Sequence, residues 1–167
     1  MKMKAHLTFV CLLLALMLVV AAACESIECP ITNVVYATYA FYTIEDGEAT
    51  AVTVLDTITV TAAGTDSVLV NKYYSQTEVE LPMSYTADAD TLVFEFTDSL
   101  SQTSYDTIWV TKENTQHYES PDCPAAMFHY VTGVSCTHHL IDSVVIVKPD
   151  IDYNVTENFQ IYFHNSN

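Results

Sequence analysis

The side chains that could do chemistry gather in the C-terminal third, where Cys136 is followed by His138 and His139, with His129 upstream. A cysteine beside a histidine can form a nucleophile–base pair, and both residue types bind metal ions. On a strand, His138 and His139 would point to opposite faces and could not share one metal ion. Cys136 and His138 would share a face at a separation of about 6.6 Å, which is too long for a nucleophile–base hydrogen bond. We therefore predict neither a catalytic residue nor a metal site here, and expect one of these histidines to be buried and the other exposed.

Acidic residues two positions apart are the second possible site, because alternate positions of a strand share a face. Such carboxylate pairs could hold calcium, but no segment has the Asp-x-Asp-x-Asp-Gly run of an EF-hand loop. A nucleophile elbow, a phosphate-binding loop and a His-Glu-x-x-His motif are also absent from the sequence. We predict a protein that is not an enzyme and has no cofactor. The enzymatic alternative is a metal-dependent hydrolase built on Cys136/His138 or on the pairs Glu78/Glu80, Asp88/Asp90 and Asp150/Asp152.

Aromatic residues offer a third kind of site, since the chain has eleven tyrosines and one tryptophan, Trp109. Aromatic rings can stack on sugars, but packing in a core or an interface is the more common use of such side chains. A glycan-binding module is therefore an alternative function, which a row of exposed tyrosines on one face would favour.

The charge balance excludes several partners. The chain has five lysines, no arginine and 21 acidic residues, so its net charge is −16. Without a basic patch it is not expected to bind nucleic acid or anionic lipid head groups.

The first 24 residues have the pattern of an export signal. Lys2 and Lys4 precede an apolar run over residues 7–20, which is short for a bilayer span but typical of a signal peptide. Three alanines then lead to Cys24, and this ending resembles a bacterial lipobox, which implies cleavage before Cys24 and lipid on its thiol. The alternative is an ordinary signal peptide cut after Ala23. We predict a signal peptide over 1–23, a lipidated tether over 24–31 and one domain over 32–167, which would carry a net charge of −18 from Cys24 onward.

Alternation of apolar and polar residues dominates the remaining chain and predicts strands. The clearest cases are Leu92/Phe94/Phe96, Ile108/Val110 and Phe159/Ile161/Phe163. Further strands are expected over 34–43, 52–60, 66–70, 78–81, 127–136 and 141–147. Eight or nine strands predict an all-β fold, an antiparallel β-sandwich, with a closed β-barrel as the alternative. Pro82 should end its strand or lie at an edge, because it has no amide proton to donate.

An exported domain can form disulfides. Once Cys24 carries lipid, Cys29, Cys123 and Cys136 remain, so at most one intramolecular bridge can form. Cys29–Cys123, which would tie the tether to the domain, is the preferred pairing. Cys123–Cys136, or no bridge, remains open.

A tripeptide of Asp, Ser or Thr, and an aliphatic residue occurs six times. Aspartate favours turns before strands, because its carboxylate accepts hydrogen bonds from nearby amides, and this structural interpretation is preferred. The tripeptide also resembles the acceptor of an O-glycosylation system found in some Gram-negative envelopes. That resemblance implies the candidate acceptors Thr57, Ser67, Thr91, Ser99, Thr107 and Ser143.

Four C-terminal motifs resemble a family of small envelope lipoproteins of unknown function from Gram-negative bacteria: SPDC at 120–123, THHLIDS at 137–143, VKP at 147–149 and NFQIYF at 158–163. The chain departs from the family pattern at Pro124 and Cys136. The resemblance implies an all-β lipoprotein and supplies no activity. We predict an exported protein that its N-terminal lipid anchors in the cell envelope, in the outer membrane, as a non-enzymatic binding or assembly module for another envelope protein.

Overall fold

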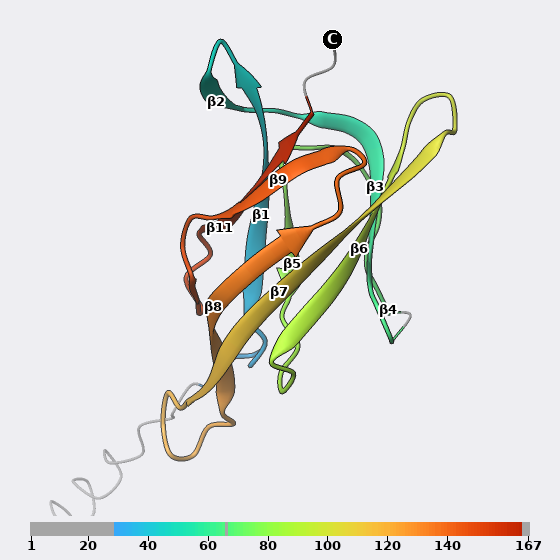
Figure 1. Ribbon diagram of the computed structural model, residues 1–167. Coiled ribbons are helices and arrows are strands. Elements are labelled where there is room, and N and C mark those ends of the chain that lie inside the picture. Colours follow the sequence, from blue (N-terminus) through green and yellow to red (C-terminus); the bar gives the residue numbers. More distant parts are fainter. Residues whose placement is uncertain (1–28, 66, 165–167) are drawn as a thin grey trace, which may run out of the picture.

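The computed structural model describes residues 29–65 and 67–164, and in these ranges the chain forms eleven strands in two packed sheets (Figure 1). None of the described residues forms a helix that is long and apolar enough to cross a membrane. The predicted all-β sandwich is confirmed, and β2 and β10 are two short strands that alternation did not predict. The strands are β1 (Tyr36–Glu45), β2 (Glu48–Ala51), β3 (Val54–Ala62), β4 (Ser67–Gln76), β5 (Glu78–Pro82), β6 (Ala89–Thr97), β7 (Thr103–His117), β8 (Ala126–Cys136), β9 (Ile141–Ile146), β10 (Asp150–Ile151) and β11 (Glu157–Phe163).

The two sheets differ in strand direction. The six-stranded sheet has the order β10-β8-β7-β6-β3-β4, and every pair in it is antiparallel. The five-stranded sheet has the order β2-β1-β11-β9, with β5 also paired to β1. In this sheet β1 and β11 run parallel, so the expectation of a purely antiparallel sandwich is wrong for that pair. The pair joins strands from opposite ends of the domain, and local alternation carries no information about such pairing.

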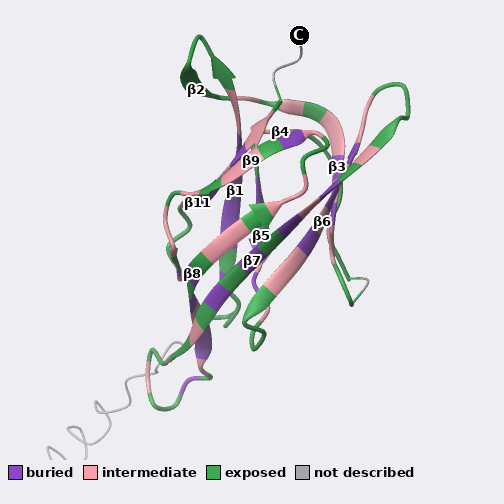
Figure 2. Ribbon diagram, viewed as in Figure 1, coloured by how far each residue is buried: buried purple, intermediate pink, exposed green. Residues whose placement is uncertain are grey.

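Alternation decides which side chains form the core. Along β6 the buried residues Leu92, Phe94 and Phe96 alternate with half-buried ones, and Figure 2 shows the same banding along β7. From the opposite sheet, Tyr39 stacks on Phe159 with 4.5 Å between ring centroids. Burial of these large rings is the main favourable contribution to folding.

Turn chemistry explains two of the strand ends. Asp46 and Gly47 both have positive φ, and they form the two-residue turn that pairs β2 with β1. An Asp-Gly pair is typical of such a tight hairpin, so this signal was present in the sequence. Pro82 is the last residue of β5, as expected.

The chain crosses between the sheets several times, and three crossings concern the site. The segment 83–88 leads from β5 to β6, the segment 137–140 leads from β8 to β9, and the segment 147–149 leads from β9 to β10. Such crossings expose backbone groups that no ladder satisfies, so their partners have to come from side chains.

Candidate functional site

A buried lysine, Lys112, is the centre of a polar cluster on the inner side of the six-stranded sheet. Lys112 lies on the inner face of β7, at a bulge against β8, and is 3% exposed. Its ammonium group donates hydrogen bonds to the carbonyl oxygens of Ser84 and Ala87 and to Oδ1 of Asn114. A lysine has three protons to donate, so its capacity is filled by protein acceptors.

The groups around Lys112 have shifted pKa values. Burial lowers the pKa of Lys112, and this outweighs the attraction of Asp90, whose carboxylate oxygen is 3.8 Å from Nζ. His129 on β8 is buried too, and burial together with the charge of Lys112 lowers its pKa to about 4. His129 is therefore neutral at pH 7, and its Nδ1 donates to Oδ1 of Asn114 at 2.7 Å.

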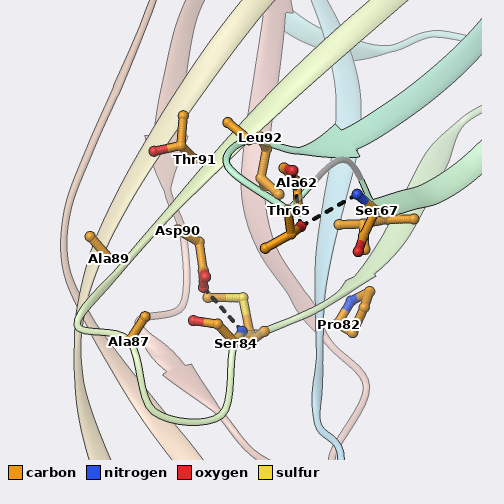
Figure 3. Close-up of a pocket in the computed structure, with 13 residues that line it drawn as sticks. Ala62, Thr65, Ser67, Pro82, Ser84, Ala87, Ala89, Asp90, Thr91 and Leu92 are labelled. Atoms are coloured by element: carbon orange, nitrogen blue, oxygen red, sulfur yellow. Dashed lines mark hydrogen bonds between the residues drawn. The ribbon is translucent and has the colours of Figure 1, made fainter.

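An open pocket of about 380 Å³ lies beside this cluster, between the β3–β4 turn, the end of β5 and the start of β6 (Figure 3). Its wall is mostly apolar, and among the described residues that line it Asp90 is the ionisable one. The carboxylate of Asp90 accepts a hydrogen bond from the amide of Ser84 at 3.3 Å, a contact that Figure 3 shows as a dashed line. General acid–base chemistry needs a second titratable group in reach, and Lys112 has already donated its protons. We assign this cluster a structural role, in which it holds the 83–88 crossing.

Asp106, nearer the start of β7, also holds a crossing segment in place. It is 1% exposed and accepts hydrogen bonds from the hydroxyl of Thr137 and the amides of His139, Leu140 and Ile141. Burial alone would raise the pKa of Asp106, but these hydrogen bonds together hold it below its ordinary value of 3.8. The charged carboxylate therefore secures the 137–140 crossing.

Asn158 holds the third crossing. It is buried on β11 and donates through Nδ2 to the carbonyl oxygens of Lys148 and Asp150, while its Oδ1 accepts from the amide of Thr38. Lys112, Asp106 and Asn158 are thus buried polar residues that join the two sheets.

The outer face of the six-stranded sheet has a different character. We use this name for the side of β3, β4, β6, β7 and β8 that points away from the five-stranded sheet. Trp109 and Tyr105 stand on it from β7, 41% and 53% exposed, and Tyr130 stands on it from β8, 50% exposed. Tyr74 of β4, 63% exposed, pairs with Thr57 of β3 on the same face. Among the described residues, none hydrogen-bonds the hydroxyls of Tyr105 and Tyr130 or the indole of Trp109, so these groups are available to a partner.

A family model matches residues 57–163, described as a family of unknown function (DUF6452). The chain belongs to this family. The matched region runs from Thr57, within β3, to the end of β11, so it includes both faces of β7. No curated protein and no solved structure matches the chain.

Family membership is compatible with the resemblance seen in the C-terminal motifs, but it does not test the lipoprotein prediction. Cys24 and the signal peptide lie outside the described residues. Cys29 and Cys123 form a disulfide in the structure, which is the preferred pairing, and Cys136 is a free thiol.

The six tripeptides do not all precede strands. Asp90 and Asp142 are second in their strands, Asp56 is third in β3, Asp98 follows β6, and Asp106 lies within β7. The predicted position was therefore wrong, although the predicted chemistry is present. Oδ1 of Asp98, for example, accepts from the amides of Leu100 and Gln102 at 2.8 Å. Asp66 is outside the described residues.

The candidate acceptors of the tripeptides differ in exposure. Ser67 and Ser99 are exposed, whereas the other four are half-buried: Thr57, Thr91, Thr107 and Ser143.

The cysteine–histidine geometry also differs from expectation. β8 ends at Cys136, so the next residues are not extended, and Cys136 Sγ lies 3.9 Å from Nδ1 of His138. That nitrogen lies 2.7 Å from the carbonyl oxygen of Asp142, to which it donates, so it cannot also accept a proton from the thiol. Burial raises the pKa of Cys136, with Asp106 and Asp142 adding to the effect. Both His138 and His139 are exposed, and the buried histidine is His129, so that expectation was wrong.

The acid pairs remain apart from other ligand-type groups. Within residues 29–65 and 67–164, no three His, Cys, Asp or Glu side chains converge as a metal site would require. Glu78 and Glu80 are exposed on β5, and Asp88 accepts from Nδ2 of Asn114 next to the Lys112 cluster.

Sequence reasoning missed Asp106, Lys112 and Asn158. A signal for the first two was available, because continuing the alternation of Ile108 and Val110 by one step in each direction places Asp106 and Lys112 on the buried face.

Proposed function

We propose that the protein is a non-enzymatic binding module of the cell envelope, anchored through lipid on Cys24, and that the outer face of the six-stranded sheet is its recognition surface. The observation that carries this proposal is the group of exposed aromatic side chains on that face. Large exposed aromatics without partners are typical of interaction sites. Asp106 and Lys112, in contrast, are buried and hydrogen-bond to segments that cross between the sheets.

The disulfide supports this arrangement, because it ties Cys29, five residues after the proposed lipidation site, to the domain. Cys123 lies in the loop between β7 and β8, at the lower end of the sandwich in Figure 1. From a lipid on Cys24 to Cys29 there are five residues, which reach about 17 Å when fully extended. The β7–β8 loop would therefore be the end of the domain nearest the membrane.

This orientation leaves the recognition surface free. Trp109 is eight residues before the end of β7 at His117, which corresponds to about 26 Å along the strand. The outer face would then extend away from the bilayer, where another envelope component can reach it.

The anchor is tested by replacing Cys24. We expect the protein to incorporate labelled palmitate and to fractionate with membranes, and we expect Cys24→Ser to abolish both. An intact mass without acyl chains in the native host would reject the anchor while leaving the recognition surface to its own test.

The recognition surface is tested by photo-cross-linking in the native host. A photoreactive amino acid at Trp109 should give adducts with an envelope component. The matched control is Val145, which is 45% exposed on the outer face of the five-stranded sheet, opposite Gln160. Equal labelling from both positions, or none from Trp109, would reject the outer face as the recognition surface.

A further inference from the structure

We propose that the outer face of the six-stranded sheet binds an uncharged oligosaccharide. The inference rests on the proposed recognition surface and names the chemical class of its ligand. Sugars have apolar C–H faces and hydroxyl edges, so a sugar-binding surface needs aromatic rings separated by hydrogen-bonding groups. The composition and the spacing of this face meet both needs.

Aromatic rings on β7 provide the stacking positions. Tyr105 and Trp109 are four residues apart on the same face of one strand, which places them about 13 Å from each other. That distance exceeds the width of a single sugar ring, so a ligand that contacts both has to be an oligosaccharide. Because both side chains stand on a regular strand, their spacing is set before the ligand arrives, which lowers the entropic cost of binding.

Hydrogen-bonding groups surround each of these rings. In the sheet register, Trp109 lies between Thr91 of β6 and Ser135 of β8. Tyr105 lies beside Glu95, which in turn lies beside Thr59 of β3. In the part of the chain that the structure describes, no side chain pairs with the Glu95 carboxylate, so it can accept hydrogen bonds from sugar hydroxyls.

The same pattern argues against a protein partner or a second copy as the occupant. A protein interface of this kind usually has a continuous apolar centre. Here, hydroxyl side chains separate the aromatic rings, and the row between those of Tyr105 and Trp109 alternates threonine with valine: Thr107, Val93, Thr61 and Val68. Tyr105 and Trp109 are therefore two separate stacking positions.

The negative charge of the outer face limits which oligosaccharides it can bind. The outward positions of β6, β7 and β8 carry Glu95 and Glu113, and Lys112 points inward. The exposed Lys72 of β4, whose amide donates to the Thr59 hydroxyl, is a cation next to this face, so the two carboxylates outnumber it. The whole chain has a net charge of −16. Uronic, sulfated or phosphorylated sugars would be repelled, so the ligand class is neutral.

The single tryptophan makes a direct test possible, because Trp109 lies on the proposed site and its fluorescence reports on that face. The lipidated protein in detergent micelles, with its disulfide intact, is titrated with hexasaccharides of glucose, mannose, xylose and N-acetylglucosamine, and with hexagalacturonate as the acidic probe. We expect at least one neutral hexasaccharide to give a saturable fluorescence change at micromolar to millimolar concentration, and hexagalacturonate to give none.

Variants then localise the site. Tyr105→Ala and Glu95→Gln should each raise Kd about tenfold, while Val145→Ala on the other sheet should leave Kd unchanged. Circular dichroism of each variant confirms that it is folded. Binding that Tyr105→Ala does not weaken, or equal binding of hexagalacturonate, would overturn the inference.

A negative titration also has a definite meaning. If no hexasaccharide alters the fluorescence and cross-linking at Trp109 captures a protein, the face recognises protein, and only the glycan inference fails. If neither experiment gives a signal, the proposed recognition surface fails with it.

Discussion

Strand β7 uses polar residues in opposite ways on its two faces. On the inner face, Asp106 and Lys112 are almost completely buried, and each is saturated with hydrogen bonds to a segment that crosses between the sheets. On the outer face, Tyr105 and Trp109 are about half exposed, and no described residue takes up their hydroxyl or indole groups. The inner face therefore maintains the fold, and the outer face is free to bind. This contrast predicts that substitutions on the two faces of one strand affect different properties.

The largest effect is expected for Asp106→Ala. The substitution leaves the hydroxyl of Thr137 and three loop amides without their acceptor, and we expect the free energy of unfolding to fall by about 4 kcal/mol. Asp106→Asn keeps the shape but loses the charge and should cost about 2 kcal/mol. Urea unfolding measures both, and hydrogen exchange should show faster exchange of the Leu140 and Ile141 amides. The control is the exposed Asp142→Asn; if it costs as much as Asp106→Asn, the special role of the inner face is rejected.

The next effect is a dependence on pH that comes from His129. The folded pKa of about 4 lies below the ordinary value of 6.5, so protonation favours the unfolded chain. The contribution of His129 to stability is complete above pH 6.5 and is lost as pH falls toward 4. This loss is about 3 kcal/mol. Unfolding free energies measured across this range should fall less steeply in His129→Gln than in the wild type. Identical slopes in His129→Gln and the wild type would contradict the prediction.

Lys112→Met should cost less than Asp106→Ala, about 2 kcal/mol. The methionine removes the donors to the carbonyl oxygens of Ser84 and Ala87 and leaves Asp90 without its cation. A neutral methionine also removes the cost of burying a charged group, the same effect that lowers the pKa of Lys112, and this reduces the net loss of stability. Limited proteolysis should cut the 83–88 segment faster, and adding Asp90→Asn should recover part of the stability. If the variant is more stable than the wild type, the cost of burying the Lys112 charge exceeds the stabilisation that its hydrogen bonds provide.

The smallest effect on stability is expected on the outer face. Trp109→Ala should lower the free energy of unfolding by about 1 kcal/mol or less. Its inward-facing neighbour Ile108→Ala should cost about 3 kcal/mol, because it leaves a cavity in the core. Thermal unfolding of the two variants measures both losses at adjacent positions, one on the inner and one on the outer face of β7. Similar losses for both would remove the distinction between the two faces of β7.

Much of this architecture could be read from local pattern. Local pattern identified nine of the eleven strands, and alternation of large apolar residues identified the inward faces of β6, β7 and β11, because a strand buried on one side has to repeat every two residues. The two missed strands are short: β2 has four exposed residues, and β10 has two residues. The outward position of Trp109 also follows from alternation, once Ile108 and Val110 are placed in the core.

The candidate site was less accessible from sequence. Cys136 and His138 were compared as strand neighbours, but β8 ends at Cys136, and the turn that follows depends on a distant carboxylate, Asp106. The buried roles of Asp106 and Lys112 required knowing which loops lie over the ends of β7. Residues 28 and 34 positions away in the chain supply their partners, as Lys112–Ser84 and Asp106–Leu140 show.

The sequence by itself determined nine of the strands, the buried faces of the clearest ones, the acidity without arginine and the Asp-Gly turn, because these depend on residue type and on neighbours a few positions away. Only the tertiary structure decided that β1 and β11 lie parallel, that Cys29 meets Cys123, and that aromatic residues from β4, β7 and β8 share one open face. These features depend on strand order, which is set by packing between segments far apart in the chain. A repeating pattern specifies which side of a strand is buried, but the neighbouring strand is chosen by the whole core.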